Sequence, residues 1–330
     1  MTKPIKIAIN GFGRIGRTIL RCLLTTRMDV ALDVVLINDI SDIDLCAHLF
    51  EFDSVFGPYH GGVEVEGDTI RFGPKQIGFS QSADLRDLDL SDIDLVIEST
   101  GQSKTRAFAE RGLMAGAGRV LISGPCETAD LTLVLGANDD ELQGQKVVSN
   151  ASCTTNALAP LLKVLDDGFG IKTGHMTTIH CYTGSQPTID APRGDMARSR
   201  AAALSMVPTT TSAARLIDKV LPHLAGRVVG CAVRVPTASV SAVDLTVQLS
   251  QAVTHEQVQK LLHASQSPII GLTEKPLVST DLRARAESIV MAMPETTVLP
   301  DGLVRVFGWY DNEWGFSNRM IDVALRMGPA

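Results

Sequence analysis

The 330-residue sequence lacks the features that mark a membrane, secreted or metal-binding protein. No apolar run approaches the length of a bilayer span, and Met1-Thr2-Lys3-Pro4 leads into an expected strand without the hydrophobic core of a signal peptide. The 6 cysteines form no CxxC pair and show no metal-ligand spacing. We therefore expect reduced thiols, no metal site, no membrane partner and a cytoplasmic protein.

Positive charge is also scarce. The chain has 30 Lys and Arg against 37 Asp and Glu, and the resulting net charge of −7 argues against nucleic acid as a partner. A hydrophobic fraction of 45% with 20% charged residues is ordinary for a soluble globular protein, and the length suffices for two domains. We find no internal repeat, low-complexity tract or long linker.

A glycine-rich turn, Gly11-Phe12-Gly13-Arg14-Ile15-Gly16, separates the first expected strand, residues 5–10, from an expected helix, residues 17–26. A second apolar run, residues 34–37, ends in Asn38-Asp39. Strand, glycine turn, helix, strand and acid in this order are typical of a dinucleotide-binding unit.

The three glycines of this turn have distinct expected roles. Gly11 would permit the tight turn, Gly13 would let a pyrophosphate approach backbone N–H groups, and Gly16 would let the helix pack closely on the strand. Asp39 would accept hydrogen bonds from the adenosine ribose and repel a 2′-phosphate, so the sequence favours NAD over NADP.

Two further apolar runs, residues 95–101 and 120–124, are expected parallel strands with a helix over 106–115 between them. Runs at 131–135 and 147–148 complete an alternating β/α half. Because ligands of such sheets bind beyond the carboxyl ends of the strands, Thr100, Gly101 and Ser123 are candidate cofactor residues, although the two hydroxyls could equally be helix caps.

The segment Ser149-Asn150-Ala151-Ser152-Cys153-Thr154-Thr155-Asn156 joins an expected strand to an expected helix over 157–164. Small polar residues at this junction are plausible caps, which places Cys153 within one turn of a helix N-terminus. Free N–H groups and the helix dipole there favour a thiolate. We therefore interpret Cys153 as an activated nucleophile, against the alternative of a buried, inert cysteine.

A β-branched run at residues 174–183 predicts a strand whose one face carries Met176, Thr178, His180 and Tyr182. His180 is the obvious partner for Cys153, although taken alone it could be a structural histidine. The second half of the chain predicts a mostly antiparallel sheet backed by helices, with a long loop over 186–199.

These segments carry a family resemblance. The octet at 149–156, the run from Thr178 to Gln186 and the C-terminal stretch Trp309–Arg319 resemble the phosphorylating glyceraldehyde-3-phosphate dehydrogenases and their close relatives, the erythrose-4-phosphate dehydrogenases. The resemblance implies an α/β fold: a Rossmann-type parallel-sheet NAD-binding domain over 1–152 and 315–330, and an α+β catalytic domain over 153–314. It also implies a homotetramer.

The resemblance further assigns roles to individual residues. It implies catalysis by Cys153 and His180, a substrate-phosphate site at Thr183 and Arg234, and an inorganic-phosphate site at Thr154, Arg200 and Thr211, with Ser152 and Ser212 beside them. Ser212 stands where the family usually has Gly, and Phe79-Ser80-Gln81-Ser82 where it usually has an adenine-packing Arg. The cofactor residues it implies are Asn10, Gly11, Phe12, Gly13, Arg14, Ile15, Gly16, Asp39, Thr100, Gly101, Ser123 and Asn312, the last for the nicotinamide carboxamide.

The expected function is NAD-dependent oxidation of a sugar-phosphate aldehyde, glyceraldehyde 3-phosphate, with inorganic phosphate as acyl acceptor and a thioester on Cys153. Three alternatives stay open at this point. The first is erythrose 4-phosphate as the substrate, and the second is a catalytically altered homologue that binds NAD or senses redox state. The third is an enzyme with altered physiology, for example one that works in the reducing direction or on arsenate.

Overall fold

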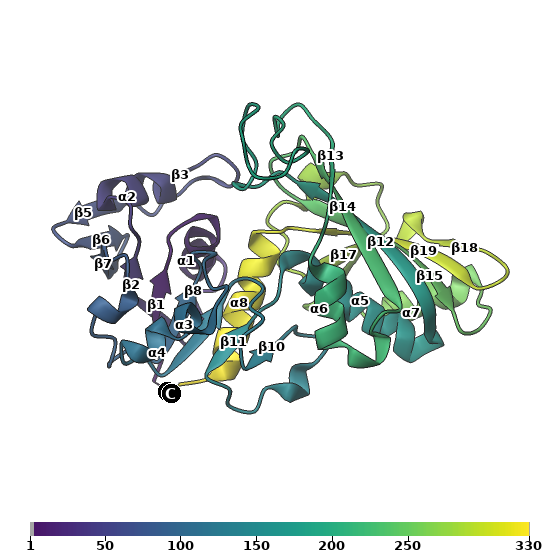
Figure 1. The fold of residues 1–330 in the computed structure, drawn as a ribbon, viewed down its shortest axis with the longest axis horizontal. Helices are drawn as coiled ribbons and strands as arrows, with labels where there is room; N and C mark the ends of the chain where they lie inside the picture. Colours follow the sequence, from purple (N-terminus) through teal and green to yellow (C-terminus); the bar gives the residue numbers. More distant parts are fainter. Residues whose placement is uncertain (1–2, 330) are drawn as a thin grey trace. The chain divides into compact units, whose positions relative to one another are not determined.

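The glycine-rich turn lies at the centre of a parallel sheet. The computed structural model describes residues 3–329, and the first strand, β1 (Ile5–Asn10), pairs in parallel with β2 (Leu32–Asn38) on one side and β8 (Leu95–Glu98) on the other. The predicted strand at 5–10 is thus confirmed to the residue. Between β1 and β2 runs α1 (Arg14–Thr25) (Figure 1).

This sheet has 9 strands in the order β10-β11-β9-β8-β1-β2-β7-β6-β5. The pairings from β10 to β7 are parallel, and β7-β6-β5 form an antiparallel extension. The remaining strands are β5 (Val63–Glu66), β6 (Thr69–Phe72), β7 (Lys75–Ser80), β9 (Arg119–Ile122), β10 (Leu131–Thr132) and β11 (Val147–Ser149), and β3 (Phe52–Asp53) pairs separately with β4 (Gly57–Pro58).

Helices cover both faces of this sheet, as the period of two in β1 requires. Gly16 of α1 packs against Ile9 on one face. Ala8 on the other face belongs to a buried cluster with Ala109 and Ala115, next to α3 (Arg106–Ala109) and α4 (Arg111–Met114). The single helix predicted over 106–115 is therefore two short ones, because the backbone tightens at Glu110 (φ −87°, ψ −2°).

A second sheet of 8 strands has the order β13-β14-β12-β15-β19-β17-β16, with β18 beside β19. All pairings are antiparallel except β14 with β12 and β16 with β17, which confirms the expected mostly antiparallel sheet. The strands are β12 (Ile171–Cys181), β13 (Val207–Thr209), β14 (Val228–Val235), β15 (Ser241–Leu249), β16 (Ile270–Thr273), β17 (Ile289–Ala292), β18 (Thr297–Val298) and β19 (Leu303–Tyr310).

The helix α5 (Cys153–Phe169) contacts this second sheet, with α6 (Ala213–Val220) and α7 (His255–Ala264) beside it. Most of α5 is apolar and fully buried, from Ala157 to Leu162, and Pro160 lies inside the helix. Met176, Thr178 and His180 of β12 are buried, whereas His175 is exposed, as the predicted alternation requires.

The chain divides into two units. Unit 1 holds the residues up to Leu133, then Asp140–Ala151 and the residues from Ser317 on; unit 2 holds Val134–Asp139 and Ser152–Phe316. The division falls in the first turn of α8 (Trp314–Met327). Within unit 1, Arg27 Nη2 donates to Asp322 Oδ1 of this helix at 2.8 Å.

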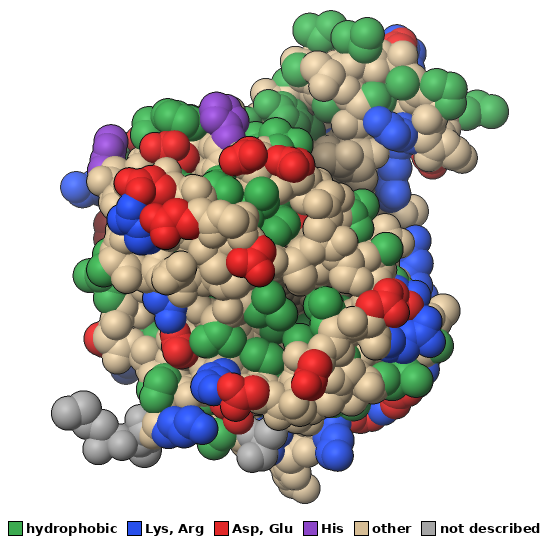
Figure 2. Space-filling model, turned by 90° about the vertical axis from the view of Figure 1, so that its left-hand side faces the viewer, with side chains coloured by type: hydrophobic (Ala, Val, Ile, Leu, Met, Phe, Trp, Pro, Cys, Tyr) green, Lys and Arg blue, Asp and Glu red, His purple; other side chains and the backbone are tan. Residues whose placement is uncertain are grey.

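Acidic and basic side chains are interspersed on the face drawn in Figure 2.

Several regular elements were not predicted from the sequence, among them α2 (Ile43–Glu51) and the antiparallel strands β5 and β6. α2 begins at an Asp42 cap that accepts a hydrogen bond from Asp44 N at 2.9 Å. These elements extend unit 1 beyond the β/α pattern that the sequence predicts.

Candidate active site

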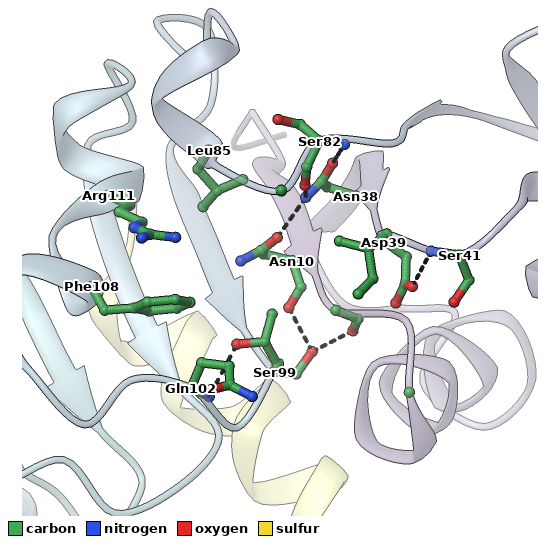
Figure 3. Close-up of a pocket in the computed structure, with 15 residues that line it drawn as sticks. Asn10, Asn38, Asp39, Ser41, Ser82, Leu85, Ser99, Gln102, Phe108 and Arg111 are labelled. Carbon is green, nitrogen blue, oxygen red and sulfur yellow. Dashed lines mark hydrogen bonds between the residues drawn. The ribbon is translucent and has the colours of Figure 1, made fainter.

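A cavity of about 600 Å³ opens at the carboxyl ends of β1, β2 and β8 in unit 1. Parallel sheets bind ligands at this edge, and the volume suits a small molecule or part of a cofactor. Of the predicted cofactor residues, Asn10, Gly11, Gly13, Asp39 and Thr100 line it. Figure 3 shows the other lining residues as well, which are Asn38, Ile40, Ser41, Ser82, Ala83, Leu85, Ser99, Gln102, Phe108 and Arg111.

The glycine turn has the geometry that the dinucleotide motif needs. Gly11 has φ +89°, and a Cβ there would come 2.7 Å from Thr100 N. A Cβ at Gly16 would overlap the Gly11 carbonyl oxygen, so only glycine lets α1 approach this closely. A Cβ at Gly13 would meet no atom within 4 Å, which leaves open space on the cavity side for a pyrophosphate to reach the backbone.

Two hydrogen bonds from backbone N–H groups hold the Asp39 carboxylate beside the glycine turn. Its Oδ2 accepts from Phe12 N at 2.7 Å, and its Oδ1 accepts from Ser41 N at 2.9 Å. This carboxylate therefore stands at the mouth of the cavity, where it can accept hydrogen bonds from a ribose and repel a phosphate ester.

A buried polar chain underlies the cavity. Asn10 donates to the Glu98 carboxylate, and Asn38 Nδ2 donates to Asn10 Oδ1 at 2.8 Å. Thr100 N donates to Glu98 Oε1 at 2.9 Å, so this acid also fixes the loop after β8. Burial raises the pKa of Glu98, and its hydrogen bonds with Thr100 and Asn10 act in the opposite direction. This buried polar chain links β8, β1 and β2 through side-chain hydrogen bonds beneath the cavity.

The other predicted cofactor residues of unit 1 do not line the cavity. Phe12 is buried and stacks on Phe50, with ring centroids 6.0 Å apart. Arg14 forms an ion pair with Asp53. The remaining four, Ile15 and Gly16 in α1, Gly101 after β8 and Ser123 after β9, lie outside the cavity lining as well.

Cys153 is the first residue of α5, as predicted. Ser152 is the cap, and its Oγ accepts from Thr155 N at 3.1 Å, while the preceding Ala151 has a left-handed φ of 53°. The thiol is half-buried, and its Sγ lies 3.7 Å from Nε2 of His180 in β12. Unit 2 therefore brings the two predicted catalytic residues into direct contact.

His180 is fixed on its other side. Nδ1 lies 2.7 Å from the Cys181 carbonyl oxygen and 2.9 Å from Arg234 Nη1, and Nη1 also donates to that carbonyl at 2.9 Å. When Nδ1–H donates to the carbonyl, Nε2 presents its lone pair to the Cys153 thiol. The imidazole is thereby oriented to take the thiol proton.

The surroundings of Cys153 and His180 favour the neutral form of both groups. Burial, and then the charge of Arg234, lower the pKa of His180 to about 4. Burial raises the pKa of Cys153, while Arg234 and the contact with Thr154 act in the opposite direction. The helix N-terminus was predicted to lower the pKa of the thiol, and this prediction is wrong, because desolvation of the thiolate outweighs the helix N-terminus.

Arg234 reaches the histidine because of strand register. β14 and β12 are parallel neighbours, and Arg234 stands opposite His180 in the pairing. Thr154 joins the same cluster from α5. Its Oγ1 lies 2.8 Å from the hydroxyl of Tyr310, which lies 2.8 Å from Thr178 Oγ1 as well. The Tyr310 ring meets the His180 ring edge-on, with centroids 6.0 Å apart.

The other predicted anion-binding residues have local partners. Thr183 Oγ1 contacts Ser185 Oγ at 2.9 Å. Thr211 Oγ1 accepts from Ala213 N at 3.1 Å, and Ser212 occupies the cap position of α6 without a side-chain cap bond. Arg200 is exposed and donates from Nε to Asp190 Oδ2 at 2.8 Å.

Asn312 is buried just after β19. Its Oδ1 accepts from Cys181 Sγ at 3.1 Å and from Ser241 Oγ at 3.4 Å. Burial raises the pKa of Cys181 to about 12, so this thiol keeps its proton and remains a donor. The two donors fix the orientation of the Asn312 amide.

Sequence reasoning missed several residues of these two sites. The missed residues lie in runs from which strands, helices or the family resemblance are predicted, but no local pattern indicates a function for them: Glu98, Phe108, Arg111, Cys181 and Tyr310. Only the pairing of strands and the return of β19 beside β15 show which side chains meet. For Glu98 a signal existed, since an acid ends an otherwise apolar run before Ser99-Thr100.

Within residues 3–329, no group of three or more His, Cys, Asp or Glu side chains is arranged to hold a metal ion. In the same range no helix combines the length and hydropathy needed to cross a bilayer.

The parallel sheet with its glycine turn is typical of a dinucleotide-binding domain, and the contact of Cys153 with His180 is a pairing that enzymes with a cysteine nucleophile use. Two family descriptions match the chain: the NAD binding domain of glyceraldehyde 3-phosphate dehydrogenase over residues 5–106, and the C-terminal domain of the same enzyme over 152–312. The protein belongs to the glyceraldehyde-3-phosphate dehydrogenase family, and NAD is its cofactor.

Curated relatives agree over nearly the whole length. Glyceraldehyde-3-phosphate dehydrogenase of Xanthobacter flavus is 47% identical, and that of Cereibacter sphaeroides is 46% identical, each over 98% of both chains. Glyceraldehyde-3-phosphate dehydrogenase 1 of Bacillus subtilis is 43% identical over 97% of both chains.

Proposed function

We propose that this protein oxidises glyceraldehyde 3-phosphate with NAD and inorganic phosphate, releasing 1,3-bisphosphoglycerate and NADH. The observation that carries the proposal is the contact of Cys153 Sγ with His180 Nε2 at 3.7 Å, with Arg234 at 2.9 Å from the same imidazole. A nucleophile, a base and a phosphate-binding cation are thus joined in one cluster.

Deprotonation of the thiol is the first task of this cluster. The pKa of about 4 makes His180 neutral at pH 7, so it can act as a base. A substrate phosphate on Arg234 offsets the charge that lowers the histidine pKa, and the imidazolium becomes easier to form. Substrate binding thereby favours transfer of the proton from Cys153 to His180.

The thiolate then adds to the aldehyde carbon and forms a hemithioacetal. The backbone N–H of Cys153 stabilises the hemithioacetal oxygen, and the imidazolium of His180 gives that oxygen its Nε2 proton. The neutral His180 then takes this proton back as the carbonyl re-forms. NAD, when bound, accepts the hydride that leaves this carbon. The acyl group stays on Cys153 as a thioester, and inorganic phosphate attacks it to release the acyl phosphate.

The remaining predicted residues have roles in binding. We assign the substrate phosphate to Thr183 and Arg234, and the attacking phosphate to Ser152, Thr154, Arg200, Thr211 and Ser212. We assign the nicotinamide carboxamide to Asn312, whose amide is already oriented by Cys181 and Ser241. We also propose that residues 1–152 and 315–330 form the NAD-binding domain and that residues 153–314 form the catalytic domain.

A homotetramer in the cytoplasm is the expected setting. The segment around residues 186–206 exposes large apolar side chains, among them Met196, which is 95% exposed. A further copy of the chain would cover such residues. All 6 cysteines are free thiols, as a reducing compartment requires.

The test is NADH formation, followed by absorbance, with glyceraldehyde 3-phosphate and erythrose 4-phosphate compared side by side, each with and without phosphate. Turnover of the triose phosphate that depends on inorganic phosphate supports the proposal. Preference for the tetrose phosphate with little need for phosphate would reassign the substrate. Absence of turnover with both aldehydes would contradict the enzymatic role.

A further inference from the structure

One side of the unit 1 cavity has no role in the function described so far. Asp39 and Ser41 lie at one side of Figure 3, and Phe108 with Arg111 at the other. The ribose and pyrophosphate of a dinucleotide account for the Asp39 side and the glycine turn. The opposite side comes from α3 and α4.

Phe108 and Arg111 form a stacked pair. The Arg111 Cζ lies 4.1 Å from the centroid of the Phe108 ring, which is the geometry of a cation–π contact. Both side chains are half-buried, and both line the cavity. Together they present an aromatic ring and a planar guanidinium to the space that the cofactor enters.

Neighbouring residues hold the pair in place. Arg111 Nε lies 3.7 Å from Asp84 Oδ1, and Asp84 is itself fixed, since its Oδ1 accepts from Arg86 N at 3.1 Å. Thr105 caps α3, and its Oγ1 accepts from Phe108 N at 3.3 Å. Contacts within the chain therefore hold the side chains of Phe108 and Arg111 in place.

The end of β7, where the resemblance implies an arginine that packs on the adenine, carries Phe79-Ser80-Gln81-Ser82 instead. Ser80 Oγ donates to Asn38 Oδ1 at 2.9 Å, and Ser82 N donates to the same oxygen at 2.9 Å. The end of β7 is thus occupied in fixing Asn38. In this chain the guanidinium at the cavity comes from α4 instead.

Resting on the NAD-dependent function proposed above, we propose that Phe108 and Arg111 form the platform on which the adenine ring of NAD stacks. A purine face stacks favourably on aromatic rings and on the guanidinium plane of arginine. The Leu85 side chain adds an apolar contact at the same cavity. Asp39 and this pair together thereby recognise the two parts of adenosine, the ribose and the base.

The test measures binding to the whole protein by calorimetry, with AMP, NAD and nicotinamide mononucleotide as probes. Phe108→Leu and Arg111→Met should each weaken AMP and NAD binding about 10-fold, or about 1.4 kcal/mol, and leave the mononucleotide unchanged. Phe108→Tyr should bind as the wild type does. Matched controls are Met114→Ala and Lys104→Met, which alter exposed residues outside the cavity and should change none of the three affinities.

Different failures have different meanings. Wild-type affinity for AMP in both platform variants, with melting curves that show folded protein, would overturn the platform while leaving the NAD-dependent function intact. If Arg111→Met loses NADP binding and keeps NAD and AMP binding, the arginine binds a 2′-phosphate and the adenine role is wrong. If the wild-type protein binds neither NAD nor AMP, the proposed function and the platform both fail.

Discussion

The cofactor cavity and the residues proposed to bind anions are built in different ways. In the cavity, Asn10, Asn38 and Glu98 are buried and bond to one another across neighbouring strands. Among the anion-binding residues, Arg200 lies on an exposed loop and is paired with Asp190. The cavity is pre-organised by the sheet, whereas a phosphate must displace existing partners of the loop residues.

This contrast suggests where each kind of specificity resides. A pre-organised cavity loses little conformational entropy on binding, so its selectivity depends on fixed groups such as Asp39. An exposed ion pair contributes little to stability, so Arg200 can exchange a carboxylate for a phosphate at small cost. Of the two arginines proposed to bind phosphates, Arg234 is the one held in place by a backbone carbonyl, that of Cys181.

The largest expected effect is on the nucleophile. Cys153→Ser should lower the rate of NADH formation by at least about 10⁴-fold, because a hydroxyl next to a neutral imidazole is a far weaker nucleophile than a thiol. Stopped-flow absorbance measures the rate, and calorimetry with NAD checks the cavity. Residual activity near that of the wild type would mean that another group forms the thioester.

The second-largest effect is expected for the substitution Arg234→Met. The KM for the aldehyde phosphate should rise about 100-fold, as expected when a charge-assisted contact to a phosphate is lost. Steady-state kinetics at saturating NAD measure it. Arg227→Met is the matched control, since this arginine donates to the Ile171 carbonyl at the far end of β12. An unchanged KM in the Arg234 variant would remove this residue from the substrate site.

The Arg234→Met variant should also change the pKa of His180. Because Arg234 is the second cause, after burial, of the low His180 pKa, its removal should raise that pKa from about 4 part of the way toward 6.5. The imidazole would then begin to protonate at a higher pH than in the wild type. NMR titration of the His180 ring measures the shift, and a fall in the pKa would contradict the assigned electrostatics.

A smaller effect is expected at the rigid cavity. Asp39→Asn keeps one oxygen for Phe12 N but removes the negative charge, so the preference for NAD over NADP should fall about 10-fold. The ratio of the two kcat/KM values measures it. Asp44→Asn, an exposed residue outside the cavity, should leave the ratio unchanged.

The smallest effect is expected at Ser212. This side chain makes no cap hydrogen bond to α6, and its backbone (φ −77°, ψ −8°) suits any residue. Ser212→Gly should therefore change the KM for inorganic phosphate by less than about threefold. A larger change would show that the serine restricts the second anion site.

The sequence predicted the parts of the fold that obey strong local rules. β1, the glycine turn and the start of α5 at Cys153 follow from periodicity, glycine chemistry and capping. α2 and the β5-β6 strands were missed. β5 and β6 are short and polar on one face, and their pairing depends on β7 rather than on their own pattern.

The candidate site was predictable only where motif and local structure coincide. The contact of Cys153 with His180 joins α5 to β12, and the position of Arg234 depends on the register of β14 against β12. The pKa of Cys153 was predicted with the wrong sign because the helix N-terminus is visible in the sequence, whereas burial of the thiol is visible only after folding.

The register between β12 and β14 also limits how the sequence can change by insertion or deletion. His180 and Arg234 stand opposite each other near the ends of their strands. One residue added or removed inside β12 or β14 ahead of this pair would turn His180 or Arg234, respectively, to the opposite face of the sheet. Over the length of this pairing, the gene can therefore vary by exchange of side chains but not by a change of length.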